Sequence, residues 1–322
     1  MLYPLTFTPL FMERVWGGRN LERLYGKALP EGKKIGESWE ITDRPDAVSL
    51  ISNGPLAGRS LRWLMENHGP EVLGPTHEGV QRFPLLVKLL DAEQALSLQV
   101  HPPADKAVSM GGEPKTEMWY IADATPEASI VAGLKQGVTR RDFEEGIASG
   151  GVADCFHRIP VRAGDVMFIP SGRPHAIGAG NVIFEIQQNS DTTYRVYDWN
   201  RVGLDGKPRE LHIAQSLRSI DFTDFEPELC TSEKVGSGAV SFRYLINDPL
   251  FRVNLTTIRR GERFYLRSHG AQILGVVKGK LSAKAGGVEV QLSPGQFALL
   301  PADLDRVAFQ AETRVEYLQV QF

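Results

Sequence analysis

The chain has little cysteine, and this shortage limits both its chemistry and its compartment. Only two cysteines, Cys155 and Cys230, occur among 322 residues, in different segments and without the close spacing of a thiolate metal site. A disulfide-stapled scaffold and a cysteine-ligated zinc site are therefore excluded. Two isolated thiols fit a reducing compartment, so we expect a cytoplasmic protein.

The chain also lacks a strong excess of one charge and any long apolar run. It carries 36 basic and 39 acidic residues, a net charge of -3. The composition therefore offers no excess of basic residues for binding nucleic acid or an anionic membrane. No apolar run approaches the ~20 residues that a membrane span needs. Glu13 and Arg14 lie near the start, where a signal peptide would have its apolar core, so none is expected.

Glycine and proline are plentiful, and they divide the chain into short segments. The 32 glycines and 20 prolines separate many short runs of valine, leucine, isoleucine and phenylalanine, a pattern typical of a mainly β protein with a few short helices. The length allows two domains or one large one. We expect short helices within residues 20–25, 57–73, 139–149 and 207–220, the second ending at His68-Gly69-Pro70.

A near-continuous apolar strand over 83–92 is interrupted by Lys88. Its ammonium would either reach the sheet edge or face an anionic ligand. The turn at 91–93 predicts a hairpin between this strand and the next, which starts at Leu96.

The strand that ends at His101 alternates apolar and polar residues, so Ser97, Gln99 and His101 share one face. After two prolines and a Gly-Gly turn, a second strand places Lys115 and Glu117 on a common face. An amide oxygen, an imidazole and a carboxylate from paired strands form an incomplete ligand set that suits Zn²⁺ or a similar divalent ion.

A fourth ligand is expected at His175. Residues 163–176 contain a turn, a short apolar strand and a Pro/Gly turn that would hold this imidazole in a fixed position. Taken singly, Gln99 or His101 is better explained as part of the solvated face of an amphipathic strand. The conjunction with Glu117 and His175 favours a metal site.

A polar and aromatic segment beyond these ligands has the character of a substrate site. Strand alternation groups Asp191, Thr193, Arg195 and Tyr197 on one face, and Arg201 follows shortly after. Guanidinium groups match phosphate geometry, so an anionic substrate is one interpretation. A salt-bridged surface strand is the other.

The C-terminal third repeats an earlier unit, since residues 294–307 align with residues 163–176. The matched pairs are Gly164 with Gly295, Pro170 with Pro301, and His175 with Arg306. Such a repeat indicates two related β-barrels, residues 1–230 and 231–322. Because the second has lost the histidine, chemistry is expected only in the first.

These motifs, in their order, resemble one known family. They are residues 96–102, Lys115-x-Glu117, residues 170–176 and Ser190-Asp191-x-x-x-Arg195, with residues 37–40 and 207–211 as further matches. The chain is similar to the short bacterial form of the type I mannose-6-phosphate isomerases (phosphomannose isomerases), members of the cupin superfamily. The resemblance covers nearly the full length. It implies two cupin-type jelly-roll barrels (a bicupin), the C-terminal one degenerate.

The resemblance also implies roles for single residues. The metal ligands would be Gln99, His101, Glu117 and His175, holding one Zn²⁺ per chain; Arg195 would be the catalytic arginine, Lys115 a site lysine, and Ser97 and Arg201 phosphate contacts. One departure is that residues 113–117 lack the histidine that longer members carry there. A proton relay through that histidine cannot operate in this chain.

The implied reaction is the interconversion of mannose 6-phosphate and fructose 6-phosphate through an enediol(ate). The base would be Lys115, Asp191 or a metal-bound water, and Lys88 could help to hold the phosphate. A cupin Fe(II) oxygenase is an alternative, although Gln99 fills a position that oxygen chemistry needs open. A non-catalytic sugar-binding cupin is another. A monomer and a homodimer are both compatible with the sequence.

Overall fold

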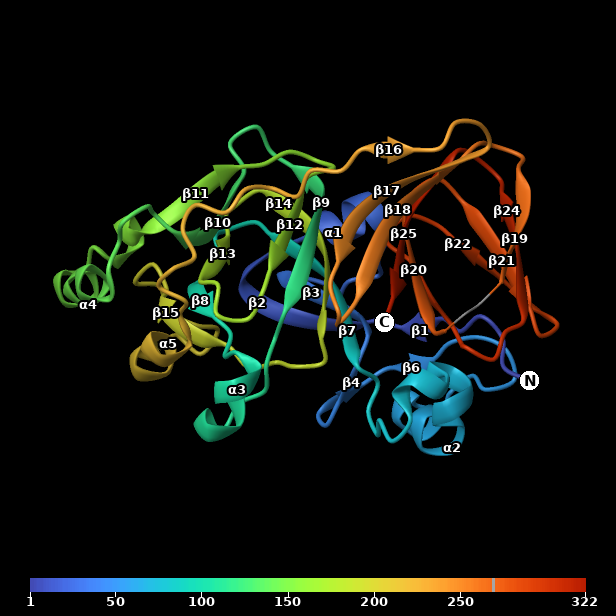
Figure 1. Cartoon of the computed structure of the whole chain (residues 1–322), viewed down its shortest axis with the longest axis horizontal. Coiled ribbons are helices and arrows are strands. Elements are labelled where there is room, and N and C mark those ends of the chain that lie inside the picture. Colours follow the sequence, from blue (N-terminus) through green and yellow to red (C-terminus); the bar gives the residue numbers. More distant parts are fainter. Residues whose placement is uncertain (268–269) are drawn as a thin grey trace.

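The computed structural model describes residues 1–267 and 270–322. Strands dominate it and the helices are few and short, which confirms the prediction of a mainly β protein with a few short helices (Figure 1). Among the described residues, no helix has the length and apolar character needed to cross a membrane.

The N-terminal half contains two antiparallel sheets, here called the N-terminal sheet pair. The six-stranded sheet has the order β12 (Val166–Ile169), β9 (Glu117–Ala124), β14 (Asn181–Gln188), β7 (Leu85–Ala92), β3 (Ile35–Ile41) and β2 (Leu10–Gly18). The five-stranded sheet has the order β11 (Phe156–Pro160), β10 (Ser129–Leu134), β13 (His175–Ile177), β8 (Leu98–Val100) and β15 (Tyr194–Tyr197). The metal-ligand candidates lie between these two sheets.

The C-terminal half contains a second pair, the C-terminal sheet pair. Its six-stranded sheet has the order β16 (Lys234–Val235), β17 (Val240–Asn247), β18 (Arg252–Ile258), β25 (Val315–Gln321), β20 (Gln272–Lys278) and β23 (Phe297–Leu300). Its four-stranded sheet has the order β19 (Arg263–Arg267), β24 (Arg306–Ala311), β21 (Leu281–Ala285) and β22 (Val288–Leu292). The order of successive strands repeats that of the N-terminal pair, with β12, β9, β14 and β7 matched by β23, β20, β25 and β18.

Two small ribbons and a few helices complete the fold. The ribbons are β1 (Phe7–Thr8) with β6 (Leu50–Ile51) and β4 (Asp43–Arg44) with β5 (Ala47–Val48). The α-helices are α1 (Asn20–Tyr25), α2 (Leu61–Leu73), α3 (Ala104–Ala107), α4 (Arg140–Ser149) and α5 (Ile213–Ser219). Short 3-10 turns span Pro75–His77, Val108–Met110 and Val152–Cys155.

Two of the predicted helices differ in extent from the observed ones. α2 does not stop at His68-Gly69-Pro70 but continues to Leu73, because the non-helical backbone of His68 kinks the helix and Pro70 starts its next turn. α5 occupies only the second half of residues 207–220. α4 agrees with prediction, and a reciprocal capping box between Thr139 and Asp142 starts it.

The predicted hairpin between residues 83–92 and the strand at Leu96 is wrong. β7 pairs with β3 and β14 along its two edges, whereas β8 lies in the opposite sheet beside β13 and β15. The run of apolar residues has another cause: β7 is an interior strand, and both of its faces are buried. The residues between β7 and β8 therefore carry the chain from one sheet to the other.

The described residues form four apolar cores, one of which packs α4 against the five-stranded sheet of the N-terminal pair. The other three lie within and between the two sheet pairs seen in Figure 1. One lies inside the N-terminal sheet pair around Trp119 and Ile183, and another lies inside the C-terminal pair around Phe309. The largest joins the two six-stranded sheets, where β7 and β14 face β18 and β25. The N-terminal segment also crosses this junction, since Leu5 exchanges two backbone hydrogen bonds with Leu299, at 2.9 and 2.8 Å.

Candidate metal centre

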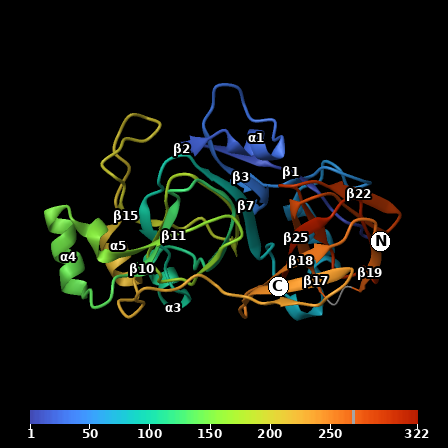
Figure 2. The same ribbon diagram turned by 90° about the horizontal axis from the view of Figure 1, so that it is seen from above.

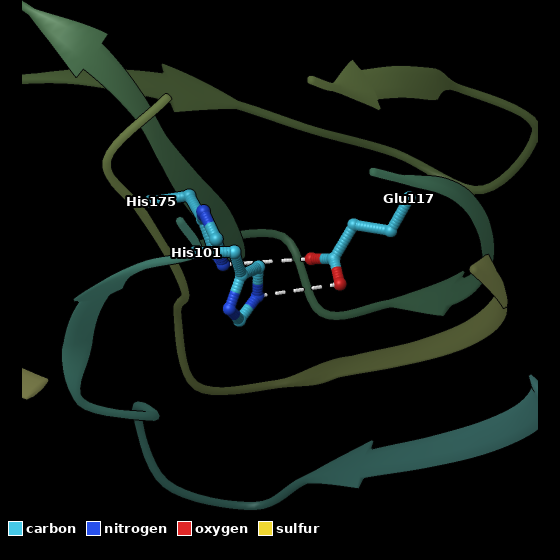
Figure 3. A group of neighbouring side chains, drawn as sticks. All are labelled: His101, Glu117 and His175. Carbon is cyan, nitrogen blue, oxygen red and sulfur yellow. Dashed lines mark ion pairs between the residues drawn. The ribbon is translucent and has the colours of Figure 1, made fainter. Parts of the chain in front are cut away.

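Three buried side chains converge between the sheets of the N-terminal pair. His101 follows the end of β8, Glu117 begins β9 and His175 begins β13. Their potential ligand atoms all lie within 4.8 Å of one another. Figure 3 shows both imidazoles directed at the carboxylate of Glu117. The structure thus brings together three of the four predicted ligands from three strands.

Backbone carbonyls fix the tautomer of both histidines. Nδ1 of His101 lies 2.8 Å from the carbonyl oxygen of Thr192, and Nδ1 of His175 lies 2.9 Å from that of Arg173. A carbonyl only accepts, so each Nδ1 carries the proton and each Nε2 presents a lone pair. Burial lowers the pKa of His101 to about 3 and also lowers the pKa of His175, so both rings are neutral near pH 7.

The carboxylate of Glu117 lies opposite these two lone pairs. Its oxygens are 3.5 Å from Nε2 of His101 and 3.4 Å from Nε2 of His175, and neither makes a well-directed hydrogen bond. Burial acts to raise the pKa of Glu117, but the ammonium of Lys115 together with His101 and His175 outweighs it, and the pKa lies well below its usual range. Two neutral imidazoles and an ionised carboxylate are the donor set that a divalent transition metal needs.

Gln99, the fourth predicted ligand, adjoins the same point. β8 and β13 place it directly opposite His175, and its Nε2 lies 3.2 Å from Nε2 of that ring. A half-turn of the amide would direct its oxygen there instead. Lys115 is also close, with Nζ 2.9 Å from Glu117 and 3.2 Å from His101. The donors present therefore fit a divalent metal ion.

A cavity of about 560 Å³ opens beside this cluster. Gln99 and Lys115 lie in its wall and separate it from the two histidines. The other lining residues are Glu13, Arg14, Val15, Trp16, Glu37, Lys88, Leu90, Leu96, Ser97, Trp119, Ile177, Glu185, Asp191, Thr193, Arg195, Gly203, Leu204, Asp205 and Arg209. Figure 2 shows the yellow loop after β15, which carries Leu204, on the same side of the molecule as β2, which carries Arg14.

Alternation along the segment before β15 predicted part of this wall. Asp191, Thr193 and Arg195 all line the cavity. Tyr197 does not: a bulge between it and Arg195 breaks the alternation, and its ring packs against Trp199 at 5.3 Å. The alternation therefore held from the segment before β15 to Arg195 and failed at the bulge within β15.

Arg195 is held firmly from both ends. Its Nη1 donates to the carbonyl oxygen of Glu210 at 2.8 Å, and its backbone N–H donates to Nδ1 of His212 at 3.2 Å. Burial lowers its pKa, and the nearby guanidinium of Arg209 lowers it further. Nε of Arg195 is buried without a hydrogen-bond partner, which leaves a donor for a bound anion.

Arg201 does not lie where the resemblance placed it. It is outside the cavity wall, and its guanidinium donates to the carbonyl oxygen of Ala95 at 2.6 Å and to Asp198 at 3.0 Å. Arg209, which the sequence analysis took only as part of a family motif, lines the cavity instead and donates twice to Asp198, each time at 2.6 Å.

Lys88 faces protein anions in the interior and not the sheet edge. Its Nζ lies 3.4 Å from Glu185 and 3.7 Å from Glu37. Burial acts to raise the pKa of Glu37, but Lys88 and Arg14 reverse this and lower it to about 2. Sequence reasoning assigned no site role to Glu37, Glu185 or Arg14. The signal for the two acids was a charged residue within a buried strand, as for Lys88 in β7.

Comparison with known proteins identifies the family. Residues 5–135 match the family model of the phosphomannose isomerase type I catalytic domain. The probable mannose-6-phosphate isomerase GmuF of Bacillus subtilis (strain 168) is 37% identical over 305 residues, which cover 94% of each chain. The chain belongs to the type I mannose-6-phosphate isomerase family. A solved structure of a mannose 6-phosphate isomerase from Bacillus subtilis superimposes with a TM-score of 0.91 at 30% identity over 100% of both chains.

A more distant member of the same fold was solved with zinc. That mannose 6-phosphate isomerase, in its zinc-bound holo form, gives a TM-score of 0.77 at 19% identity, covering 99% of this chain and 100% of its own. At this identity the likeness concerns the fold. The buried cluster of His101, Glu117 and His175 is the feature of this chain that fits a metal.

Proposed function

We propose that this chain catalyses the interconversion of mannose 6-phosphate and fructose 6-phosphate. Family membership supports this reaction directly. The observation that carries it is the convergence of His101, Glu117 and His175 behind a cavity whose wall holds Arg195 and Arg209. The cavity thus has a set of metal ligands behind part of its wall, and arginine cations in the wall itself that could bind a phosphate.

The reaction moves a carbonyl group between C1 and C2 of the sugar. A proton must leave a carbon atom next to the carbonyl, and an enediolate must be stabilised. We propose that Gln99, His101, Glu117 and His175 hold one Zn²⁺ ion, which when bound would act as a Lewis acid toward the sugar oxygens. Arg195 adds fixed positive charge in the same cavity through its unpartnered Nε.

The proton must be carried by a group that reaches the substrate. Lys115 and Asp191 both line the cavity, and Lys115 lies against the proposed ligands Glu117 and His101. We propose that one of them transfers the proton, either directly or through a bound water. The position where longer family members carry a histidine cannot take part, because residues 113–117 contain none.

The phosphate group needs a cation that is exposed to the cavity. We assign it to Arg209, with the hydroxyl of Ser97 as a further contact, since both line the wall. Two assignments made from the sequence are less well supported: Arg201, which the family resemblance implied, and Lys88, which its place in an apolar strand suggested. Arg201 lies outside the cavity wall, and Lys88, although it lines the wall, is paired with Glu37 and Glu185.

The two other functions considered have less support. An Fe(II) oxygenase would need an open position beside the histidines and carboxylate, and Gln99 lies against that point. A non-catalytic sugar-binding protein would have no need of four convergent ligands together with Arg195. Membership of an isomerase family disfavours both.

For the architecture, we propose two cupin-type barrels, residues 1–230 and 231–322. The repeated strand order of the two sheet pairs supports this division. Arg306 begins β24 as His175 begins β13, so the C-terminal barrel lacks the corresponding ligand. We also propose a cytoplasmic location, which the two free cysteines favour.

The test is a coupled assay for fructose 6-phosphate formed from mannose 6-phosphate. The wild type should turn over, Glu117→Gln should lose at least about 100-fold in kcat/KM, and the surface variant Lys284→Gln should match the wild type. No turnover by the metal-loaded wild type on this or related aldose phosphates would overturn the proposal.

A further inference from the structure

A second polar cavity lies at the junction of the two sheet pairs, away from the metal centre. Two adjoining hollows of about 240 and 430 Å³ share Lys234, Ser241, Thr257 and Arg314 as lining residues. Strands β16, β17 and β18 form much of their wall, and Tyr120 of β9 contributes from the N-terminal pair. Figure 1 shows these strands near one another where the two halves meet.

The wall of these hollows is strongly cationic. Its basic residues are Lys234, Arg243, Arg259, Lys278 and Arg314, and its only acid is Glu316. The whole chain has a net charge of -3, so the excess is local and does not follow from composition. Unpaired like charges gathered around a hollow repel one another, and an anion bound among them would remove that cost.

Few of these cations have a partner in the protein. Among the described residues, one ion pair lies in this wall, between Arg314 and Glu316 at 3.3 Å. Arg243 donates only to the hydroxyl of Ser232, at 3.1 Å. Lys234 and Lys278 have no carboxylate within 4.0 Å in the part of the chain that the structure describes. Their ammonium groups are therefore free to meet a ligand.

Neutral donors lie among the charges. The hydroxyls of Ser241 and Thr257 line the hollows, and Ser241 is buried. Tyr120 is buried as well, and burial raises its pKa to about 12, so it remains a phenol that can donate. Ammonium, guanidinium and hydroxyl donors around one small hollow are the set that recognises phosphate groups.

We propose that this junction is a binding site for a small metabolite with two phosphate groups, separate from the isomerase cavity. The hollows are small and limited to one place on the surface, which suits a compact ligand better than a polymer. Because the lining comes from both halves, such a ligand would bridge β9 of one sheet pair to β16–β18 of the other.

The test is calorimetric titration of fructose 1,6-bisphosphate into the metal-loaded full chain, at constant ionic strength and with mannose 6-phosphate in excess to occupy the other cavity. The double variant Lys234→Gln/Lys278→Gln should bind the bisphosphate roughly tenfold more weakly or worse. The control Lys280→Gln/Lys284→Gln removes the same charge from exposed positions outside the hollows and should bind like the wild type. Arg209→Ala should also keep this binding.

Several outcomes would overturn the site. One is the absence of saturable binding to the wild type, and another is binding that disappears in Arg209→Ala but survives in the double variant. A third is a wild type that does not bind the bisphosphate but binds a single-stranded oligonucleotide saturably, with that binding lost in the double variant. The junction would then be a surface for polyanions and not a site for a small metabolite. Isomerase turnover and thermal melting of the double variant, both expected to match the wild type, separate a failed site from a misfolded variant.

Discussion

At the residue scale, the metal centre depends on groups that are not themselves ligands. The carbonyl oxygens of Thr192 and Arg173 accept hydrogen bonds from Nδ1–H of His101 and His175. The lone pair of each Nε2 therefore faces Glu117. The ligand types and their grouping followed from strand alternation and turn positions in the sequence. The tautomers did not, because they depend on carbonyls that come into place only when the chain is folded.

Gln99→Ala should weaken zinc binding by about 10- to 100-fold, since the amide adjoins His175 at the proposed metal position. Competition with a fluorescent chelator measures the affinity. Gln94→Ala, an exposed glutamine outside the cavity wall, is the matched control. Equal affinity for both variants would remove Gln99 from the ligand set.

Arg209→Ala should raise KM for mannose 6-phosphate by about 10- to 100-fold, the loss expected for a charge-assisted bond to phosphate. Arg201→Ala should have a smaller effect, because that guanidinium is outside the cavity wall. Steady-state kinetics on the two variants decides the point. A larger effect from Arg201→Ala would restore the assignment made from resemblance.

Acid should destabilise the protein partly through Glu37, whose pKa in the folded chain is about 2. A carboxyl with a lowered pKa stabilises the fold above its usual pKa of 4.5, and this stabilisation is lost as the pH falls toward the folded value. From roughly pH 6 to pH 3, the free energy of unfolding should therefore fall about 2 kcal/mol more in the wild type than in Glu37→Gln.

Denaturant titrations at each pH measure this difference. Glu144→Gln, at an exposed carboxylate on α4, is the control and should keep the acid dependence of the wild type. If Glu37→Gln also kept it, the stability would not be linked to this carboxyl.

At the element scale, the turn between β12 and β13 joins two of the proposed ligands. Gly172 has φ +94°, its N–H donates to the carbonyl oxygen of His101 at 2.9 Å, and a Cβ there would lie 3.3 Å from the carbonyl of Ser219. The Pro/Gly pattern before His175 predicted a fixed turn. It did not reveal that the turn is bonded to the residue that follows β8.

Gly172→Ala should lower the free energy of unfolding by about 1–2 kcal/mol and weaken zinc binding, because strain in this turn shifts both His101 and His175. Gly137→Ala is the matched control, since it has φ +83° with no atom near the added Cβ. It should cost stability alone. Zinc binding unchanged in Gly172→Ala would show that the turn does not position the ligands.

Elements were predicted more reliably than their pairing. The run over 83–92 gave a strand correctly, but proximity in sequence suggested a hairpin with the segment at Leu96, whereas β7 and β8 lie in opposite sheets. Pairing depends on contacts between distant segments, such as β7 with β14, which no local pattern encodes. Arg209 was missed as a wall residue for the same reason, because its loop reaches the cavity only in the folded chain.

At the scale of the whole molecule, the two sheet pairs are not independent. The largest apolar core lies between their six-stranded sheets, and Leu5 of the N-terminal segment pairs with Leu299 of β23. The repeat of residues 163–176 in residues 294–307 pointed to two barrels. It did not indicate that the two sheet pairs would share a core.

A fragment of residues 1–230 should therefore fail to fold stably by itself, because it would expose the apolar faces of β7 and β14.

In the full chain, Phe251→Ala should lower the free energy of unfolding by about 3–5 kcal/mol and leave one cooperative transition, since Phe251 is fully buried in the shared core. Differential scanning calorimetry on the fragment and on the variant measures the stability and the number of transitions. Two separate transitions, or a soluble and cooperatively folded fragment, would contradict this account.

The most direct test of the central claim follows turnover of mannose 6-phosphate together with metal content. The enzyme is assayed as purified, after stripping with a chelator, and after addition of Zn²⁺, with metal per chain measured in each state. We predict that activity falls with the metal and returns as Zn²⁺ approaches one ion per chain. Full activity in a preparation free of metal would contradict the account.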